Sequence, residues 1–399
     1  MTKPKPPSGT QGRVVIAAAL TQQSGYGGHV WTLLQYVLGY LRLGWDVLFV
    51  DRLDPDMCLD RAGRRCPPEQ SQGAQDFARV MDAFGLLDRA ALLVEGRTVV
   101  GVAKPTLVER TRNATFLLNV MGYLHDDDLL AASPRRVFLD IDPGFGQMWR
   151  ELGLADVFSG HDAFVTVGEN IREPGCGIPD CGLDWITTVP PVVLDLWPRS
   201  IRKRDVFTTV GTWRGPNGPV QYRGRTYGLR VHEFRRFADL PRRAGRSLEA
   251  ALDIDPTDER DRDALRAGGW SLVDPRQVAG GTETYRQYIQ ESMGEVMVAK
   301  NMYVQTQGGW FSDRSVCYLA SGKPVVAQDT GWTRNHPAGT GLQSFNTLEE
   351  AAAAIQEVQG NYRKHATAAR GLAEAEFASG PVLERLAARV CQASVGIGA

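Results

Sequence analysis

Short apolar runs alternate with stretches of helical periodicity along most of this chain, and this alternation constrains the fold more than any other feature. Residues 14–20 (VVIAAAL) form an uninterrupted apolar run, as expected for a strand buried in a parallel sheet. Residues 30–43 repeat apolar side chains at helical spacing, Gly44 can end the helix, and DVLFVD follows as a second strand. Residues 14–51 therefore predict one β-α-β unit of a doubly wound sheet.

The alternation continues in two series with a linker between them. The runs ATFLLNV, RRVFLDID and AFVTVG predict further strands of the first series, and residues 54–75 look like an excursion from it. The segment PVVLDLWPRSIRKRD has prolines and a burst of charge, which is typical of an interdomain linker. A second series begins at VFTTVGTWRG. Its further predicted strands are SLEAALDI, MYVQTQ and PVVAQD. Its predicted helices are VHEFRRFADL, YRQYIQESMGEVMVAK, a helix that begins near Ser312, and the segment from Leu348 onward.

A chain of 399 residues is longer than one hydrophobic core usually grows, so two α/β domains are expected, with a cleft between them. We predict a disordered tail at 1–13, a first Rossmann-like domain at 14–197 and a second at 198–377. Residues 378–399 are predicted to form a C-terminal helix that can return to the first domain.

Composition disfavours several other classes of protein. The formal net charge is -1 and the basic residues are scattered, so a nucleic-acid partner is not expected. No apolar run approaches the ~18 residues of a membrane helix, and the polar N-terminus does not resemble a signal peptide, so we expect a cytoplasmic protein. The six cysteines are irregularly spaced, which favours reduced structural thiols over a disulfide framework or a metal site.

One segment of the second series has a specific order of motifs. In QGGWFSDRSVCYLASGKPVVAQDTGW, a Gly-aromatic loop precedes a helix, a small-Gly-x-Pro-Val-Val strand and a polar loop. This order resembles the donor-lobe signature of the GT-B-fold glycosyltransferases. The segments GHVWTLLQYVLGYLRLGWDVLFVD, FLDIDPGFGQMW and SFNTLEEAAAAI also look like parts of actinobacterial-type transferases in this superfamily. The resemblance covers most of the chain and is strongest in residues 295–350.

The resemblance implies two Rossmann-like lobes that face a central cleft, with a nucleotide-diphosphate sugar bound to the second lobe as co-substrate. It implies no metal and no other cofactor. One large subgroup of retaining enzymes carries Glu-x7-Glu at the start of this helix, and alignment on Gly322-Lys323-Pro324 puts Gly309 and Cys317 at those two places. The ribose-binding mode and the stereochemical outcome of that subgroup therefore do not carry over.

The loop and helix start at residues 308–315 are the main candidates for donor binding. A departing diphosphate needs positive charge or backbone N–H groups, and a Gly-containing loop here enters a helix with Ser312 or Asp313 as its N-cap. Arg314 adds a positive charge, and its structural alternative is a surface ion pair. The candidates in this segment are Gly309, Trp310, Ser312, Asp313, Arg314 and Ser315.

Thr212, Trp213 and Arg214 follow the first strand of the second series, where the sheet edge should face the cleft. Trp213 can stack on a base or a sugar, and Arg214 can bind phosphate. The alternative for Trp213 is packing between the lobes.

Lys300, Asp329 and Thr330 complete the predicted donor site. Lys300 is a second candidate for the diphosphate, or a lysine that interacts with a helix dipole. Asp329 and Thr330 follow the last donor strand, where a carboxylate can accept hydrogen bonds from sugar hydroxyls or form an Asx turn.

His29 and Asp142 are the catalytic candidates of the first lobe. His29 follows an acceptor-side loop that contains Tyr26, Gly27 and Gly28, and this loop does not match the G-x-G-x-x-G dinucleotide fingerprint. His29 is a candidate general base or phosphate ligand, with a capping or core histidine as the alternative. Asp142 precedes Pro143, which favours extended geometry, and is our preferred acceptor-side base, with turn formation as the alternative.

The run His125-Asp126-Asp127-Asp128 looks like a metal site, but acidic residues before an apolar run favour a helix N-terminus.

The sequence thus predicts a metal-independent glycosyltransferase, hexosyltransferase-like, with an unidentified acceptor that is a small molecule, a glycan or a lipid-linked sugar. Two alternatives remain open: a nucleotide-sugar epimerase of the same fold, and a non-catalytic protein that binds nucleotide sugars. The missing Glu pair is the observation that favours the last.

Overall fold

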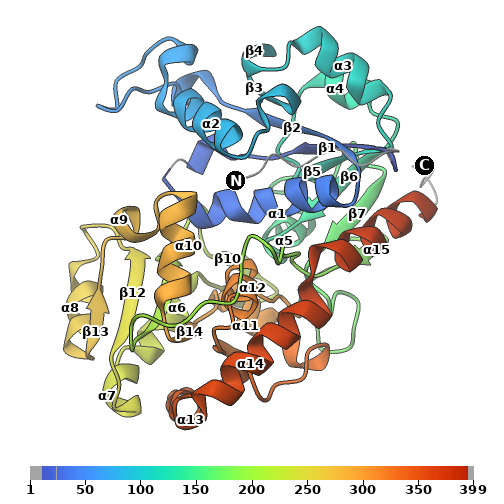
Figure 1. Ribbon diagram of the computed structural model, residues 1–399. Helices are drawn as coiled ribbons and strands as arrows, with labels where there is room; N and C mark the ends of the chain where they lie inside the picture. Colours follow the sequence, from blue (N-terminus) through green and yellow to red (C-terminus); the bar gives the residue numbers. More distant parts are fainter. Residues whose placement is uncertain (1–10, 24, 394–399) are drawn as a thin grey trace.

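The computed structural model describes residues 11–23 and 25–393 and has two lobes, each built on a parallel sheet (Figure 1). Among the described residues, the sheet of the first lobe has eight strands in the order β4-β3-β2-β1-β5-β6-β7-β8, with β4 antiparallel to β3. They are β1 (Arg13–Ala17), β2 (Asp46–Arg52), β3 (Ala90–Val94), β4 (Arg97–Gly101), β5 (Phe116–Val120), β6 (Arg136–Asp140), β7 (Ala163–Thr166) and β8 (Trp185–Thr187).

The second lobe holds a parallel sheet in the order β13-β12-β9-β14-β15-β16 and a small hairpin. The strands of the sheet are β9 (Phe207–Thr212), β12 (Leu248–Asp253), β13 (Trp270–Leu272), β14 (Gly294–Met297), β15 (Val325–Gln328) and β16 (Leu342–Phe345); β10 (Val220–Tyr222) and β11 (Arg225–Tyr227) form the hairpin. The strand order reverses between β1 and β5 in one lobe and between β9 and β14 in the other. These two positions are the topological switch points, where open α/β sheets bind ligands.

Helices cover both sheets. Those that precede the linker are α1 (Gly27–Arg42), α2 (Gln72–Ala83), α3 (Lys104–Arg112), α4 (Asp127–Ala132) and α5 (Phe145–Glu151). Those after it are α6 (Arg230–Phe234), α7 (Leu240–Ala244), α8 (Glu259–Ala267), α9 (Pro275–Ala279), α10 (Thr282–Glu291), α11 (Asn301–Thr306), α12 (Asp313–Ala320), α13 (Leu348–Gly360), α14 (Tyr362–Leu372) and α15 (Ser379–Gln392). In Figure 1, α15 runs from the second lobe back along the first, where it packs on α1.

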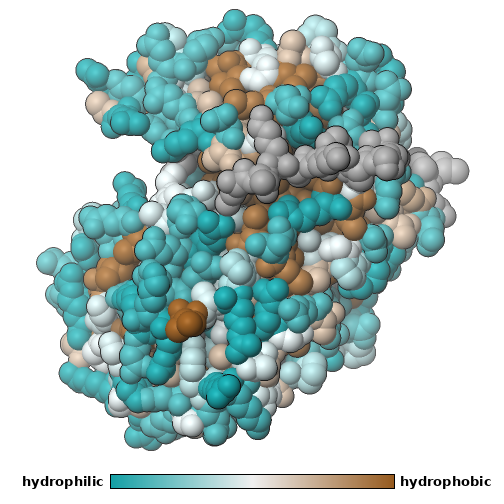
Figure 2. Space-filling model, viewed as in Figure 1, coloured by the Kyte–Doolittle hydropathy of each residue, from teal (hydrophilic) through white to brown (hydrophobic). Residues whose placement is uncertain are grey.

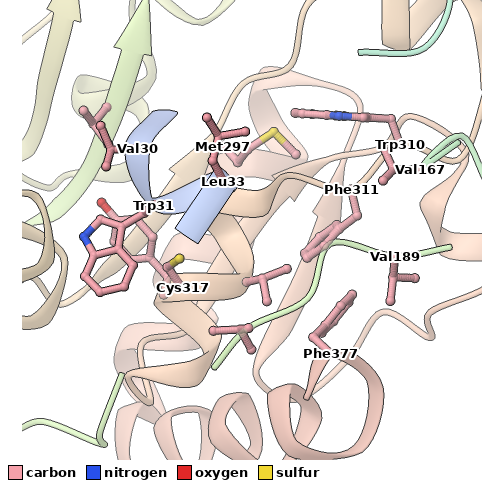
Figure 3. Packing of buried hydrophobic residues seen from close by; sticks show 14 of the residues in the cluster. Val30, Trp31, Leu33, Val167, Val189, Met297, Trp310, Phe311, Cys317 and Phe377 are labelled. Carbon is pink, nitrogen blue, oxygen red and sulfur yellow. The ribbon is translucent and has the colours of Figure 1, made fainter. Parts of the chain in front are cut away.

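Helix α1 joins the lobes. It carries the apolar positions that the sequence spacing indicated, and Trp31 donates a hydrogen bond from its ring N–H to the Thr282 carbonyl at 2.8 Å. A Cβ on Gly27 would lie 2.3 Å from the Gly281 carbonyl oxygen, so only glycine permits this approach. Figure 3 shows Val30, Trp31 and Leu33 in the hydrophobic core that they share with Met297 and Cys317 of the second lobe.

The predicted two-lobed α/β class is confirmed, and the strand–helix–strand unit at 14–51 appears as β1, α1 and β2. The predicted tail at 1–13 lies largely outside the described residues, and Arg13 already belongs to β1. No helix within the described ranges is long and apolar enough to cross a bilayer.

The secondary structure predicted for residues 294–306 is wrong. Residues 294–297, predicted as helix, form strand β14, and residues 302–306, which belong to the predicted strand MYVQTQ, lie in helix α11 (Asn301–Thr306). The cause is tertiary, because β14 is fully buried and pairs with both β9 and β15, and this pairing overrides local periodicity.

Candidate active site

A cleft of about 480 Å³ lies between the lobes and is lined by residues that follow the carboxyl ends of strands in both sheets. Hydrophobic atoms are visible along the boundary between the lobes in Figure 2, on a surface that is otherwise mostly hydrophilic. Of the residues predicted from the sequence, the cleft brings together Tyr26, Gly28, His29, Asp142, Thr212, Lys300, Trp310, Ser312, Asp313 and Arg314.

Arg230 lies at the switch point of the second lobe. Its Nε donates to the carbonyl of Thr212, the last residue of β9, at 3.1 Å, and its Nη1 donates to the Val298 carbonyl directly after β14 at 2.6 Å. The residue is 7% exposed and forms no salt bridge with any carboxylate in the described part of the chain. Burial, and then the nearby charge of Arg314, lower the pKa of Arg230 to about 10, so this guanidinium remains charged at neutral pH.

Arg314, in the first turn of α12, is the second buried cation of the cleft. It donates to Glu295, which is fully buried on β14, and to the Val210 carbonyl at 2.8 Å. Burial lowers the pKa of Arg314, but Glu295 and the neighbouring tyrosines outweigh burial and raise that pKa above its usual value. Its Nη2 has no hydrogen-bond partner among the described residues. The predicted alternative of a surface ion pair is therefore wrong, because the pair is internal.

The start of α12 faces the cleft. Ser312 is the N-cap, but its hydroxyl caps no backbone N–H and has no hydrogen-bond partner in the described ranges, although Ser312 is 1% exposed. Asp313 begins the helix and accepts a hydrogen bond from the Thr32 hydroxyl of α1. Unpaired N–H groups at a helix start favour an anion.

Lys300 is the third cation, and it connects the lobes. It is the N-cap residue of α11, where the helix dipole disfavours a positive charge, and its Nζ donates to Asp142 at 2.5 Å. The Tyr303 hydroxyl donates to the other carboxylate oxygen of Asp142. Burial, together with Asp142, raises the pKa of Tyr303 well above its usual value, so this phenol stays protonated. We call Arg230, Lys300 and Arg314 the cation cluster.

His29 lies in the first turn of α1 and lines the cleft. Its Nε2 donates to the Ala19 carbonyl after β1 at 2.6 Å, which leaves Nδ1 as the nitrogen that can accept a proton. Burial lowers the pKa of His29, so the imidazole is neutral at physiological pH. A neutral imidazole with one free lone pair has the form that a general base requires.

Trp213 and Arg214 do not line the cleft. The Trp213 ring is 1% exposed, packs against Phe234 and donates to Asp261 at 2.9 Å, all within the second lobe. It therefore offers no face to a base or sugar, and it does not pack between the lobes. Arg214 is exposed and paired with Asp258 in a neighbouring depression.

The predicted sugar contact of Asp329 and Thr330 is also corrected. Asp329 accepts hydrogen bonds from Gly331 N at 2.9 Å and from the Thr333 hydroxyl at 3.0 Å, which is the Asx-turn alternative. Thr330 is buried and donates to the Trp310 carbonyl.

Three further candidates lie behind the cleft surface. The Gly309 N–H is bonded to the Thr330 carbonyl, so it does not face a phosphate. Ser315 is buried, and its hydroxyl has no partner in the described residues but does not line the cleft. Gly27, expected in an acceptor-side loop, instead packs on the second lobe.

Sequence reasoning missed Arg230 and Tyr303. Neither belongs to a motif, and the only signal for Arg230 is its position directly before the helix predicted at VHEFRRFADL. No group of His, Cys, Asp and Glu side chains within the described ranges is arranged to hold a metal. The sequence favoured a helix N-terminus at the acidic run 126–128, and the structure has one there. Asp126 is the N-cap of α4, and its carboxylate accepts a hydrogen bond from Leu129 N at 3.1 Å.

No protein-family model and no curated protein matches this sequence. Several solved structures have the same fold. An α-glucosyltransferase in complex with UDP-glucose and DNA containing an abasic site is 12% identical, with a TM-score of 0.58 over 95% of this chain and 99% of that one.

AviGT4, a glycosyltransferase involved in avilamycin A biosynthesis, is 12% identical, with a TM-score of 0.55 over 95% of this chain and 98% of that one. Sucrose-phosphate synthase from Thermosynechococcus elongatus is 10% identical, with a TM-score of 0.53 over 96% of this chain and 100% of that one. The protein therefore has the GT-B fold that its sequence predicted.

Proposed function

We propose that this GT-B-fold protein transfers a sugar from a nucleoside-diphosphate sugar to an acceptor hydroxyl, without a metal. The observation that carries the proposal is Arg230, a buried cation at the switch point that lacks a carboxylate partner among the described residues. A buried charge is costly unless it is paired, so this position favours an anionic ligand.

A diphosphate fits the groups around Arg230. Glu295 pairs with Arg314 and Asp142 pairs with Lys300, whereas Arg230 has no salt bridge among the described residues. The carboxylates of Glu295 and Asp313 act on Arg230 only as nearby charges, so its guanidinium can still bind an anionic ligand. Arg314 Nη2 and the Ser312 hydroxyl are donors in the same wall that have no partner among the described residues. These donors would stabilise the negative charge that develops on the diphosphate as the sugar leaves, which is the role that a metal plays elsewhere.

The acceptor reaction needs a base in the first lobe if the configuration is inverted. The acceptor oxygen would bond to the anomeric carbon as the bond to the diphosphate breaks, and His29 or Asp142 would take the hydroxyl proton. Among the described residues no hydrogen bond to His29 Nδ1 is present, whereas Asp142 must first exchange a hydrogen bond. The structural neighbours support a nucleotide donor, since the α-glucosyltransferase has been solved with UDP-glucose and with UDP.

The direct test is thermal stabilisation of the full chain by UDP, ADP, GDP and dTDP, each with and without EDTA. A ligand that binds the native state raises the melting temperature by mass action. We expect at least one nucleotide to do so, and EDTA to leave the shift unchanged. Melting curves that no nucleotide moves would refute the donor site, and a shift that EDTA abolishes would refute the metal-free mechanism.

A further inference from the structure

One wall of the cleft is apolar and belongs to the first lobe. Its side chains follow the carboxyl ends of β5, β6 and β7, lie on α5, or lie in the loop between α5 and β7. They are Met121, Ile141, Val167, Trp149 and Val157. We call them the apolar wall. Among the described cleft-lining residues of this part of the first lobe, the charged side chain is Asp142. Its two carboxylate oxygens already accept hydrogen bonds, one from Lys300 and the other from Tyr303.

The apolar wall presents hydrophobic surface to the cleft. Met121, Ile141, Trp149 and Val157 are half-buried because they pack on the core from one side and line the cleft on the other. Covering this surface with an apolar ligand is favourable, whereas a sugar ring placed here would leave its hydroxyl groups without partners.

The backbone holds Met121 in an uncommon conformation. Its φ of 56° lies in the left-handed region, although methionine has a side chain that disfavours that region. The Met121 N–H donates to the Leu139 carbonyl at 2.8 Å, and its Sδ accepts from Ile141 N at 3.3 Å. Such strain persists only where the surroundings fix it, and it concentrates at ligand sites.

An aromatic pair lines the cleft beside this wall. Trp310 stacks on Tyr303, with ring centroids 4.1 Å apart and planes 23° apart, and an isolated β-bridge ties Trp310 to Gly168 of the first lobe. Trp310 lines the cleft, and Figure 3 shows its ring with Val167. Flat rings pack well against such aromatic surfaces.

We infer that the acceptor is a planar, apolar small molecule that carries a hydroxyl group, such as a phenol or a polycyclic alcohol. The inference rests on the proposed function, because it assigns the second substrate of the same cleft. A polyanionic acceptor fits the site poorly. Among the described residues that line the cleft near the apolar wall, the cation is Lys300, and its charge is already paired with Asp142. Arg150 and Arg223, on the adjoining surface, are paired with Asp156 and Glu151.

The transfer step balances with this acceptor. The phenolic oxygen bonds to the anomeric carbon, the bond from that carbon to the diphosphate oxygen breaks, and the nucleoside diphosphate leaves with the bonding electron pair. The phenolic proton passes to a base of the first lobe. A phenol loses its proton near pH 10, far more readily than a sugar hydroxyl, which reduces the demand on that base.

The test uses 4-methylumbelliferone, a fluorescent two-ring phenol, with the full-length protein. Its binding is measured by fluorescence anisotropy without any donor. Its glycosylation by UDP-, ADP- or GDP-glucose is measured by the loss of phenolate fluorescence, beside maltotriose and a short DNA duplex as competing acceptors. Met121→Asn keeps a residue that tolerates the left-handed backbone, and Val157→Lys places a charge in the apolar wall. Leu154→Lys is the matched control, because Leu154 is 69% exposed and outside the cleft.

We expect both wall variants to raise the dissociation constant of the phenol by roughly tenfold or more, with nucleotide affinity unchanged. The melting temperature should fall because both side chains also pack on the core, and the unchanged nucleotide affinity shows that the variants remain folded. Leu154→Lys should bind as the wild type does. Any one of three results would overturn the inference. The phenol does not bind, both wall variants bind it as tightly as the wild type, or the sugar is transferred to maltotriose or DNA in preference to the phenol. Phenol binding that the wall variants weaken, in a protein that binds no nucleotide, would support the inference and refute the proposed donor site instead.

Discussion

Asp142 of the first lobe accepts a hydrogen bond from Lys300 of the second lobe at 2.5 Å, and the Tyr303 hydroxyl occupies its other oxygen. The contact places the preferred acceptor-side carboxylate against the cation cluster. A diphosphate that reached Lys300 would compete with Asp142 for this cation. Donor binding and release of the carboxylate would then be coupled, as expected when two anions share one ammonium group.

Replacing Asp142 with Asn tests this coupling. The amide cannot neutralise Lys300, so nucleotide affinity should stay the same or increase. If Asp142 is the base, the transfer rate should fall by roughly 10² to 10⁴-fold. Both quantities come from nucleotide titration and steady-state rates. His29→Gln tests the alternative base. Wild-type rates in both variants would exclude both base assignments and favour a retaining mechanism. The anomeric configuration of the product, determined by NMR, would then identify that mechanism.

Arg230→Met should weaken nucleotide binding without a large loss of stability. Removing a charge-assisted hydrogen bond to phosphate costs about 1.5–3 kcal/mol, roughly 10- to 100-fold in affinity. In the ligand-free protein the substitution removes a buried charge that has no carboxylate partner among the described residues, which offsets the loss of its bonds to two carbonyl groups. Calorimetric titration and urea unfolding measure the two effects. Unchanged affinity would show that Arg230 is purely structural.

Arg314→Met should behave differently, because its partner Glu295 is fully buried. Breaking a buried pair from one side leaves the other charge unpaired and typically costs about 3–5 kcal/mol. The surface ion pair that the sequence allowed for Arg314 would contribute little to stability, whereas the observed pair is buried. The double variant Arg314→Met/Glu295→Met should be more stable than either single variant in urea unfolding. Additive losses would show that the two side chains are not energetically coupled.

Gly27→Ala should disrupt the contact between the lobes. The added Cβ would lie 2.3 Å from the Gly281 carbonyl oxygen, which is backbone and can give way only if the lobes separate. We expect a lower melting temperature and a larger radius of gyration in small-angle scattering. Gly371→Ala is the matched control, since it also lies in a helix and its Cβ would meet nothing within 4 Å, so it should be neutral or stabilising. A Gly27→Ala protein with wild-type dimensions and stability would contradict the close approach.

Asp51 should make stability depend on pH between about 4 and 7. Burial raises the pKa of this carboxyl to about 7, although Thr21 and Arg52 donate backbone hydrogen bonds to it. Across this window the folded protein keeps a proton that the unfolded chain releases, so the free energy of unfolding falls as pH rises and levels off above pH 7. The Asp51→Asn substitution removes this pH-dependent contribution to the free energy of unfolding. Its stability relative to the wild type should therefore increase from pH 4.5 to 8 in urea unfolding, and a constant difference would contradict the raised pKa.

The sequence by itself determined the fold class. Continuous apolar runs such as residues 14–20 and the spacing in α1 are local properties, and they specify strand and helix before any tertiary contact forms. The ordered segment from Gly308 to Trp332 gave the family resemblance in the same way, because the order of loop, helix and strand is written along the chain. The placement of His29 and Asp142 at sheet edges followed from the rule for parallel strands.

The tertiary structure alone decided which polar groups meet. Arg230 gains its importance because β9 and β14, far apart in sequence, become neighbours and both end at its guanidinium. The burial of Trp213 and the pairing of Asp142 with Lys300 likewise depend on which strands and lobes lie side by side. Local periodicity carries no information about that choice, because strand order and lobe packing are set by the total burial of apolar surface over the whole chain.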